Sequence, residues 1–326
     1  MSLAQLLRFG VPQGSVLGPL LFTIYISPLS QIICRHKHQF HQFADDNELY
    51  LSFKKSNTTS AISSIEECVN DIKKWMTQNK LKLNDSKTEV ILIRSKFDHS
   101  PLPLTSINIC SSVIETTSSA RNIGVIFDDN YTFQQHIITT CRTIHFLLRK
   151  IGHIRKYLSQ DSCATLVHAV ISSKLDYCNS LLYGLPDVHL QRLQRAQNTA
   201  ARIITRTRKF EHITPILKQL HWLPVSHRIV FKLLLFTYKA LNGISPQYLK
   251  NLITPRSSLR TLRSSDKCLL HTPKWNLVSY GRRSFSSAAP ELWNSLPLDI
   301  KTSPNVNIFK RRLKTHIFQR AFSSPF

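Results

Sequence analysis

Three features are missing from this 326-residue sequence: paired cysteine motifs, a long unbroken apolar run, and acidic residues near the amino terminus. The 7 cysteines are scattered, odd in number and include no C-x-x-C. This pattern is typical of reduced thiols, so we expect an intracellular protein of the nucleus or cytoplasm, not a secreted one. The residues Cys34, His36, His38 and His41 match no structural zinc spacing, and we expect them in a solvated loop.

No charged residue lies between Arg8 and Arg35, so this stretch has to be tested as a membrane segment. Prolines and glycines, among them Pro12, Pro19 and Pro28, interrupt it well before it reaches the length of a membrane-spanning helix. We therefore expect neither a signal peptide nor a transmembrane helix, and no membrane partner.

A buried helix explains the same stretch better. Gly18 is expected at its N-cap, with Pro19 at the first helical position, where a missing N–H costs nothing. Its apolar residues are predicted to pack under a sheet: Leu20, Leu21, Ile24, Tyr25 and Leu29.

The charge of the chain is strongly asymmetric. Its 43 Lys and Arg against 19 Asp and Glu give a formal charge of +24. Residues 1–130 hold 13 basic and 12 acidic side chains, whereas residues 131–326 hold 30 and 7. A partner rich in phosphate is the simplest physical reason for a near-neutral half joined to a cationic one.

Two adjacent carboxylates, Asp45 and Asp46, lie between the short apolar runs Gln39–Phe43 and Leu49–Phe53. The runs are typical of strands, so the acidic pair is predicted at or near a hairpin turn. Carboxylate oxygens are the ligands that Mg²⁺ prefers, and such a pair could form part of a two-metal phosphoryl-transfer site. Taken alone, the pair is equally typical of two solvated turn residues.

The stretch Gly10–Phe22 contains Pro12-Gln13-Gly14 and precedes Phe43-Ala44-Asp45-Asp46. Together these resemble two consecutive palm motifs of reverse transcriptases, the PQG loop with its helix and the [Y/F]-A-D-D hairpin. The residues of these motifs are most similar to those of the jockey-like group of non-LTR (LINE) retrotransposons. The resemblance continues through Lys80–Leu92, Asn122–Phe127 and Leu220–Leu235 and so covers most of the chain.

The resemblance implies an α+β fold in which residues 1–130 form a partial palm. A helical, basic, thumb-like region over 131–210 and a helical, basic carboxyl-terminal region over 211–326 would follow. The family reaction is RNA-templated DNA synthesis, in which a primer 3′ hydroxyl attacks the α-phosphate of a dNTP between two Mg²⁺ ions. RNA template, DNA primer and dNTP are thus the implied partners.

The resemblance also assigns roles to individual residues. Asp45 and Asp46 would be the catalytic, metal-binding pair, and Gln13 and Gly14 would line the nucleotide and template pocket. Lys87 would lie near the triphosphate, where it can neutralise or protonate the leaving pyrophosphate. An ordinary exposed lysine beside the expected strand Glu89–Ile93 explains Lys87 as well.

One departure from the family concerns activity. A two-metal polymerase needs a further aspartate from a separate strand, upstream of the PQG loop, yet no Asp or Glu precedes Asp45. The fingers and the preceding endonuclease are also missing, so we expect a reverse transcriptase domain that is inactive as this fragment. The alternatives are a non-catalytic, basic, nucleic-acid-binding remnant and a non-functional gene-model fragment.

Helical periodicity predicts one helix over Ser60–Asn79 and dominates after Thr132. Five helices are expected there: Phe133–Gly152, Ser159–Ser173, Val188–Arg206, Ser226–Asn242 and Asn305–Phe318. Arg256–Lys267 and Ser279–Ser287 are expected to be loops.

Basic residues on two of these helices are candidates for nucleic-acid contact. Within Val188–Arg206 four arginines fall within roughly one quarter of the helical wheel, and no acidic residue lies between Asp187 and Glu211. Contacts of this kind position a nucleic acid without reading its sequence. The nucleic-acid-binding candidates are Arg192, Arg195, Arg202, Arg206, Arg208, Lys209, Lys310, Arg311, Arg312 and Lys314.

Overall fold

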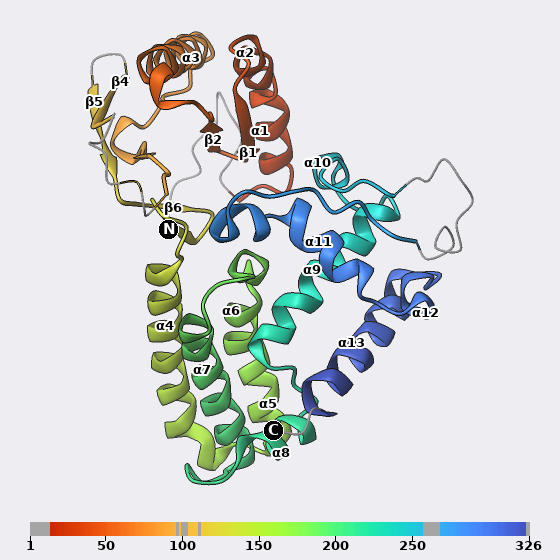
Figure 1. The fold of residues 1–326 in the computed structure, drawn as a ribbon. Helices are drawn as coiled ribbons and strands as arrows, with labels where there is room; N and C mark the ends of the chain where they lie inside the picture. Colours follow the sequence, from red (N-terminus) through yellow and green to blue (C-terminus); the bar gives the residue numbers. More distant parts are fainter. Residues whose placement is uncertain (1–13, 96–97, 99–103, 110–111, 257–267, 324–326) are drawn as a thin grey trace. The chain divides into compact units, whose positions relative to one another are not determined.

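The computed structural model describes residues 14–95, 98, 104–109, 112–256 and 268–323. The chain divides after Asn130 into two compact units, and each is described by itself (Figure 1). Helix and sheet are mixed, which confirms the α+β expectation at that level. Every described helix is too short or too polar to cross a lipid bilayer.

Among its described residues the first unit has three α-helices: α1 (Gly18–Ile26), α2 (Leu29–Arg35) and α3 (Thr58–Gln78). Helix α3 coincides with the expected Ser60–Asn79 helix. Its apolar face packs on α2, where Ile33 and Cys68 are fully buried. Two histidine side chains of this region make contacts with α3. His36 Nε2 lies 2.9 Å from Asp71 Oδ2, and His38 Nε2 lies 3.0 Å from the Ser64 carbonyl oxygen.

The strands of this unit form three small sheets. An antiparallel hairpin joins β1 (Gln39–Phe43) to β2 (Asp46–Tyr50). A three-stranded sheet pairs β5 (Ser112–Thr117) in parallel with β3 (Val90–Ile91) and antiparallel with β4 (Ser106–Ile109). A second hairpin joins β6 (Ser119–Asn122) to β7 (Val125–Asp128).

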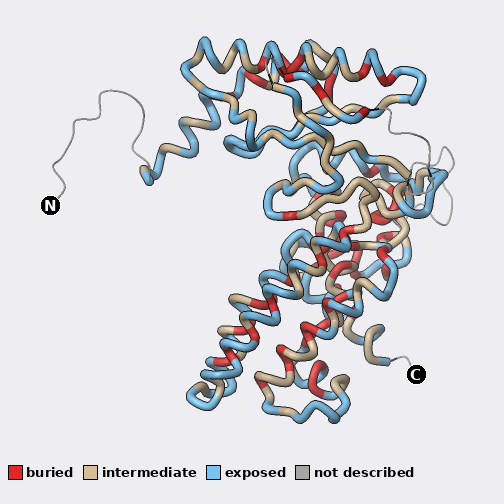
Figure 2. Tube along the Cα trace, turned by 90° about the vertical axis from the view of Figure 1, so that its left-hand side faces the viewer, coloured by how far each residue is buried: buried red, intermediate tan, exposed pale blue. Residues whose placement is uncertain are grey.

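The expectation of a buried first helix is wrong for Leu20, Leu21, Ile24 and Tyr25, whereas Leu29, which begins α2, is buried as expected. Helix α1 begins one residue earlier than expected, with Leu17 at its N-cap, and most of its apolar side chains point outward, although Ile26 is buried and Phe22 packs on the core. The exposed fractions of Leu20 and Ile24 are 59% and 61%, and Figure 2 shows α1 largely in the colours of exposed and intermediate residues. The reason is that α2 and α3 already cover the inner side of the β1–β2 hairpin, through Phe40 and Leu49.

The second unit is almost entirely helical. Its α-helices are α4 (Gln134–Ile154), α5 (Gln160–Val167), α6 (Ser173–Asp176), α7 (Asp187–Thr205), α8 (Ile213–Gln219), α9 (Val225–Leu241), α10 (Gln247–Lys250), α11 (Phe285–Asn294), α12 (Leu298–Lys301) and α13 (Val306–Ser323). Short π-helical turns over His168–Ser172 and Val278–Arg282 connect some of them. The five helices expected after Thr132 are all present, although the second is divided into α5, the first π turn and α6.

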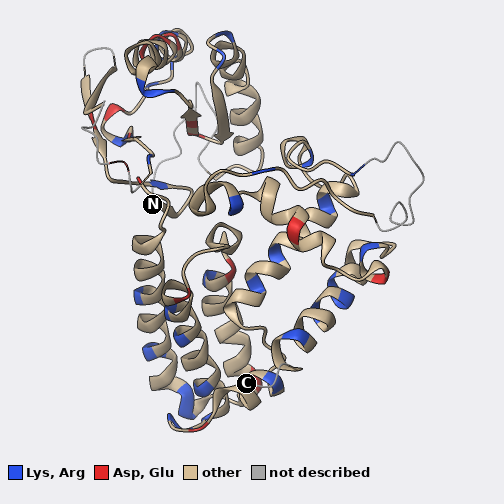
Figure 3. Ribbon diagram, viewed as in Figure 1, with Lys and Arg blue, Asp and Glu red and all other residues tan. Residues whose placement is uncertain are grey.

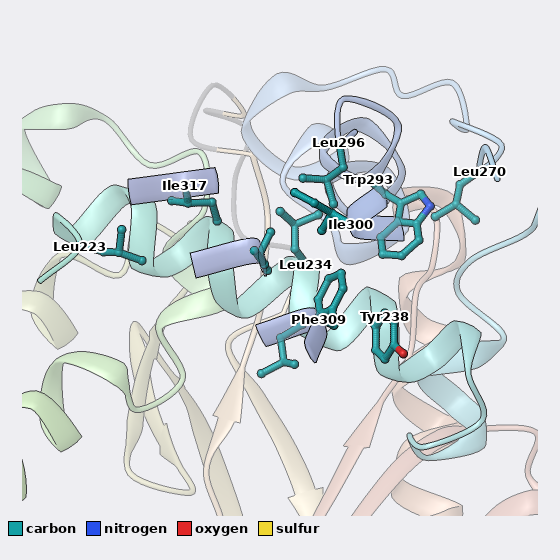
Figure 4. Packing of buried hydrophobic residues seen from close by; sticks show 11 residues of the cluster. Leu223, Leu234, Tyr238, Leu270, Trp293, Leu296, Ile300, Phe309 and Ile317 are labelled. Carbon is teal, nitrogen blue, oxygen red and sulfur yellow. The ribbon is translucent and has the colours of Figure 1, made fainter. Parts of the chain in front are cut away.

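Two packing centres hold this unit together. Helices α4 and α7 pack along each other, and α9 packs against α11 and α13. In the second centre the rings of Tyr238 and Phe309 are stacked with centroids 4.2 Å apart, beside the buried Trp293 (Figure 4). The Tyr238 hydroxyl donates a hydrogen bond of 2.7 Å to the Ser303 carbonyl, so its polar end is satisfied in the core.

The expected loop over Ser279–Ser287 is instead helical, formed by the Val278–Arg282 turn and the beginning of α11. Its arginines stabilise this structure: Arg282 forms an ion pair of 2.9 Å with Glu291, and Arg283 donates to the Tyr183 carbonyl at 3.1 Å. The other expected loop, Arg256–Lys267, lies outside the described residues except for Arg256.

Candidate catalytic hairpin and nucleic-acid interface

The β1–β2 hairpin places Asp45 and Asp46 side by side at its tip. The register pairs Phe43 with Asp46, which leaves Ala44 and Asp45 as a two-residue turn. Ala44 adopts a left-handed conformation with φ 53°, which the tight reversal of the chain requires. Both carboxylates are exposed to solvent.

The strands of the hairpin are anchored in the hydrophobic core of the first unit. Phe40 and Leu49 are cross-strand partners, and both pack on the α2–α3 core. Because side chains alternate along a strand, this anchor fixes which positions face the core and which stay exposed.

The two carboxylates suit Mg²⁺ in type, since this ion is usually bound by one or two carboxylates together with substrate phosphates. They do not complete a two-metal site. Glu48, the third acid of the hairpin, accepts a hydrogen bond of 2.8 Å from Asn122. Within the ranges that the structure describes, no group of three or more His, Cys, Asp or Glu side chains could hold a metal ion.

Of the nucleotide-binding candidates, the structure describes Gly14 and Lys87 but not Gln13. Gln13 lies outside the described residues, whereas Gly14 is exposed, with φ 88° and no atom within 4 Å of an added Cβ. Lys87 is exposed at the end of a 3₁₀ turn, Asp85–Lys87. The ion pair at this turn is made by Lys73, whose Nζ lies 3.2 Å from Asp85 Oδ2, and not by Lys87.

Helix α7 has the two faces that its sequence predicts. Leu193, Ala196, Ala200 and Ile204 are buried, with exposed fractions of 2% or less. The buried polar side chain on this face, Gln197, donates 2.9 Å to the Leu223 carbonyl. Its neighbour Gln194 accepts from the Val225 N–H at 2.8 Å, so α7 holds the segment that leads into α9.

The four predicted arginines, three on α7 and Arg206 at its left-handed C-cap, divide into two pairs. Arg192 and Arg195 are exposed. Arg202 donates to the Glu211 carbonyl at 3.1 Å, and Arg206 donates to the Arg155 carbonyl at 3.3 Å. The single surface expected from the helical wheel is therefore two surfaces, one open to solvent and one engaged with backbone.

Arg192 and Arg195 face a groove of about 420 Å³ between α7 and α4. Three residues of α4 that sequence reasoning missed, Arg142, His145 and Arg149, line it as well, and none of its lining residues is acidic. Figure 3 shows Lys and Arg along both helices. The sequence could have predicted these residues, because Arg142, His145 and Arg149 are spaced by three and four positions, which places them on one face of a helix.

The remaining basic candidates lie elsewhere in the second unit. Arg208 and Lys209 are exposed beyond the end of α7. Lys310, Arg311 and Lys314 are exposed on α13, whereas Arg312 donates to the Asp299 carbonyl at 2.6 Å. These residues form no cluster with the α4–α7 groove lining.

Comparison with known proteins supports the resemblance. Residues 5–147 match the family model described as reverse transcriptase (RNA-dependent DNA polymerase). The "Probable RNA-directed DNA polymerase from transposon X-element" of Drosophila melanogaster is 27% identical over 202 residues, which cover 60% of this chain and 22% of that protein. The corresponding protein from transposon BS is 29% identical over 219 residues, 63% of this chain and 23% of that protein.

A third relative, the RNA-directed DNA polymerase from mobile element jockey of Drosophila funebris, is 23% identical over 213 residues. The chain thus spans less than a quarter of the length of these curated relatives. No solved structure matches the chain.

Proposed function

We infer that this chain, whose residues 5–147 belong to the reverse transcriptase family and whose relatives are jockey-like non-LTR elements, is part of a retrotransposon RNA-directed DNA polymerase. The observation that carries the proposal is the β1–β2 hairpin, which presents Asp45 and Asp46 together at an exposed turn. A palm-like role for residues 1–130 and a thumb-like role for the helices after them, divided near residue 210, belong to the same proposal.

In this assignment Asp45 and Asp46 bind Mg²⁺, the divalent ion that such enzymes generally use. When bound, Mg²⁺ would offset negative charge on the reacting phosphates. Gln13 and Gly14 contact nucleotide and template, and Gly14 suits this because no side chain obstructs its backbone. Lys87, exposed and outside the Asp85 ion pair, has an amine available for a triphosphate.

The polypeptide of residues 1–326 is proposed to be inactive by itself. Asp45 is its first acidic residue and lies on the same hairpin as Asp46 and Glu48. Glu48 also accepts a hydrogen bond from Asn122. None of these three acids is a ligand from a separate strand. Two carboxylates on one turn leave the second ion without its bridging ligand.

Primer extension tests this directly. The purified 326-residue chain, an RNA template with an annealed DNA primer, dNTPs and Mg²⁺ should give no product above the level of Asp45→Ala. Incorporation that Asp45→Ala abolishes would overturn the proposed inactivity and would place a further acidic ligand in the chain.

Binding of nucleic acid is the second proposed activity, and it would operate without catalysis, in the nucleus or cytoplasm. The charge asymmetry favours it: residues 131–326 carry 30 basic against 7 acidic side chains. Their binding to an RNA hairpin and an unrelated DNA duplex should show little sequence preference. Affinity should fall as salt is raised, with a log–log slope magnitude of about 0.7–0.9 per phosphate contacted. An absence of binding at low salt would contradict this part of the proposal.

A further inference from the structure

We propose that the groove between α4 and α7 is the site where this protein holds the sugar-phosphate backbone of nucleic acid, an inference that rests on the proposed binding activity. The basic surface of α13 and the carboxyl-terminal arginines of α7 are excluded as the principal contact. The groove brings together residues 50 positions apart in the sequence, such as Arg142 and Arg192, so it exists only in the folded unit.

Basic side chains make up most of the groove lining. Arg142, His145 and Arg149 come from α4, and Arg192 and Arg195 come from α7. Ile138 and Cys141 complete the lining. Helix α4 contains no acidic residue, and the one acid of α7 is Asp187 in its first turn. An anion in the groove would therefore meet attraction from both sides and no carboxylate.

The four arginines of the groove are available to a ligand. All four are exposed, and the part of the chain that the structure describes gives their guanidinium groups no carboxylate or carbonyl partner. Arg202, Arg206 and Arg312 differ, because each already donates to a backbone carbonyl. A phosphate there would have to compete with these hydrogen bonds.

The spacing of the α4 residues suits a strand backbone. At about 1.5 Å per residue, Arg142 and Arg149 lie roughly 10 Å apart along the helix axis. One strand of a duplex places a phosphate about every 3.4 Å along its axis, so this row spans about three phosphates. Arg192 and Arg195, one helical turn apart, face the same strand from the opposite wall. Since phosphate is common to RNA and DNA, we expect both to bind.

The test compares two variants that each lose four positive charges. The groove variant replaces Arg142, Arg149, Arg192 and Arg195 by Gln, and the control variant replaces the exposed lysines Lys156, Lys174, Lys250 and Lys274 by Gln. Binding of the full chain to the labelled RNA hairpin and DNA duplex is measured by fluorescence anisotropy across a salt series. The groove variant should flatten the log–log slope by roughly 3, and the control variant by less than about 1.

A third variant separates charge from folding. Replacing the same four arginines by Lys keeps the cations, so the salt slope should stay near that of the parent even if affinity falls. Circular dichroism melts of all variants check that the helices are intact. A slope that falls equally in the Lys and Gln variants would overturn the electrostatic assignment.

Cys141 provides a readout that does not depend on charge deletion. Its thiol lies in the groove lining, and bound backbone should protect it from alkylation by N-ethylmaleimide, followed by mass spectrometry. Cys178, which is exposed and outside the groove, should react equally with and without nucleic acid.

Two failures are distinguishable. If the parent chain does not bind at low salt, the proposed binding activity fails and this inference with it. If the parent binds but the control variant loses as much slope as the groove variant, or Cys141 stays unprotected, the binding activity stands and the groove is not its site.

Discussion

The guanidinium of Arg206 donates a hydrogen bond of 3.3 Å to the backbone carbonyl of Arg155, and Arg155 in turn reaches back to the end of α7. Arg155 Nε and Nη2 donate to the carbonyls of Ile203 and Ile204 at 2.8 and 2.7 Å, and Nη1 donates to Leu158 at 2.7 Å. Carbonyls in the last turn of a helix have no intrahelical partner, so Arg155 satisfies groups that would otherwise need water. The ends of α4 and α7 are thereby fastened together.

Replacing Arg155 by Gln should destabilise the protein by about 2–4 kcal/mol, because hydrogen bonds from a charged donor are lost at a partly buried helix end. Urea unfolding followed by circular dichroism measures this. Lys156→Gln, an exposed change at the next residue, is the matched control and should lie within about 0.5 kcal/mol of the parent. Equal effects of the two changes would show that the Arg155 contacts contribute no stability.

Gln197 supports a second long-range connection. Its amide is 1% exposed and donates to the Leu223 carbonyl. Gln197→Ala should cost about 1–3 kcal/mol, since it leaves that carbonyl buried without its donor. Gln191→Ala, on the exposed face of the same helix, should be nearly neutral in the same urea titration. A neutral Gln197→Ala would mean that water replaces the lost donor.

Stability should decrease as the pH is lowered. Burial lowers the pKa of His168, His227 and His316 below the usual value, with Arg228 and Lys314 adding to this at His168 and Arg320 at the other two. Asp176 acts in the opposite direction at His168. The unfolded chain therefore takes up protons that the folded chain resists, so stability is present above about pH 6.5 and is lost below it.

Urea midpoints at pH 7.5, 6.5 and 5.5 test this pH dependence. Replacing His168, His227 and His316 together by Gln removes the three titrating groups, so the decrease between pH 7.5 and 5.5 should become shallower. A midpoint that rises on acidification, or a triple variant with the parent's pH dependence, would contradict the assignment.

Local patterns in the sequence were enough to predict the hairpin and α7. The apolar run Gln39–Phe43 predicted β1 with its observed bounds, whereas the second run, Leu49–Phe53, overlaps β2 (Asp46–Tyr50) only at Leu49 and Tyr50. The adjacent aspartates at the turn are neighbours in the chain, so their proximity needed no prediction of tertiary structure. In α7 the helical period separated the buried Leu193 and Ile204 from the basic face. Such features depend on residues within a turn or two of each other.

What the sequence could not predict depends on partners far along the chain. Helical periodicity predicted Arg202 and Arg206 on one face with Arg192, but Arg206 is the left-handed C-cap beyond α7. Both arginines donate to backbone carbonyls, of Glu211 and Arg155, which no periodicity reveals. The groove forms because α4 packs beside α7, and this packing places Arg142 and Arg149 in the same groove lining as Arg192 and Arg195. The apolar residues of α1 predicted a buried helix. Hydrophobicity alone does not identify the surface against which a helix packs, so the prediction was wrong.

The outward face of α1 leads to the last prediction. Replacing Leu20 and Ile24 together by Gln should leave the free energy of unfolding within about 1 kcal/mol of the parent, because both side chains are already more than half exposed. Light scattering of the same variant should show less self-association, since contiguous exposed apolar side chains promote it. Ile33→Gln is the matched control: Ile33 is fully buried, and a polar group there should cost several kcal/mol. An α1 variant that unfolds as readily as Ile33→Gln would contradict the exposed placement of Leu20 and Ile24.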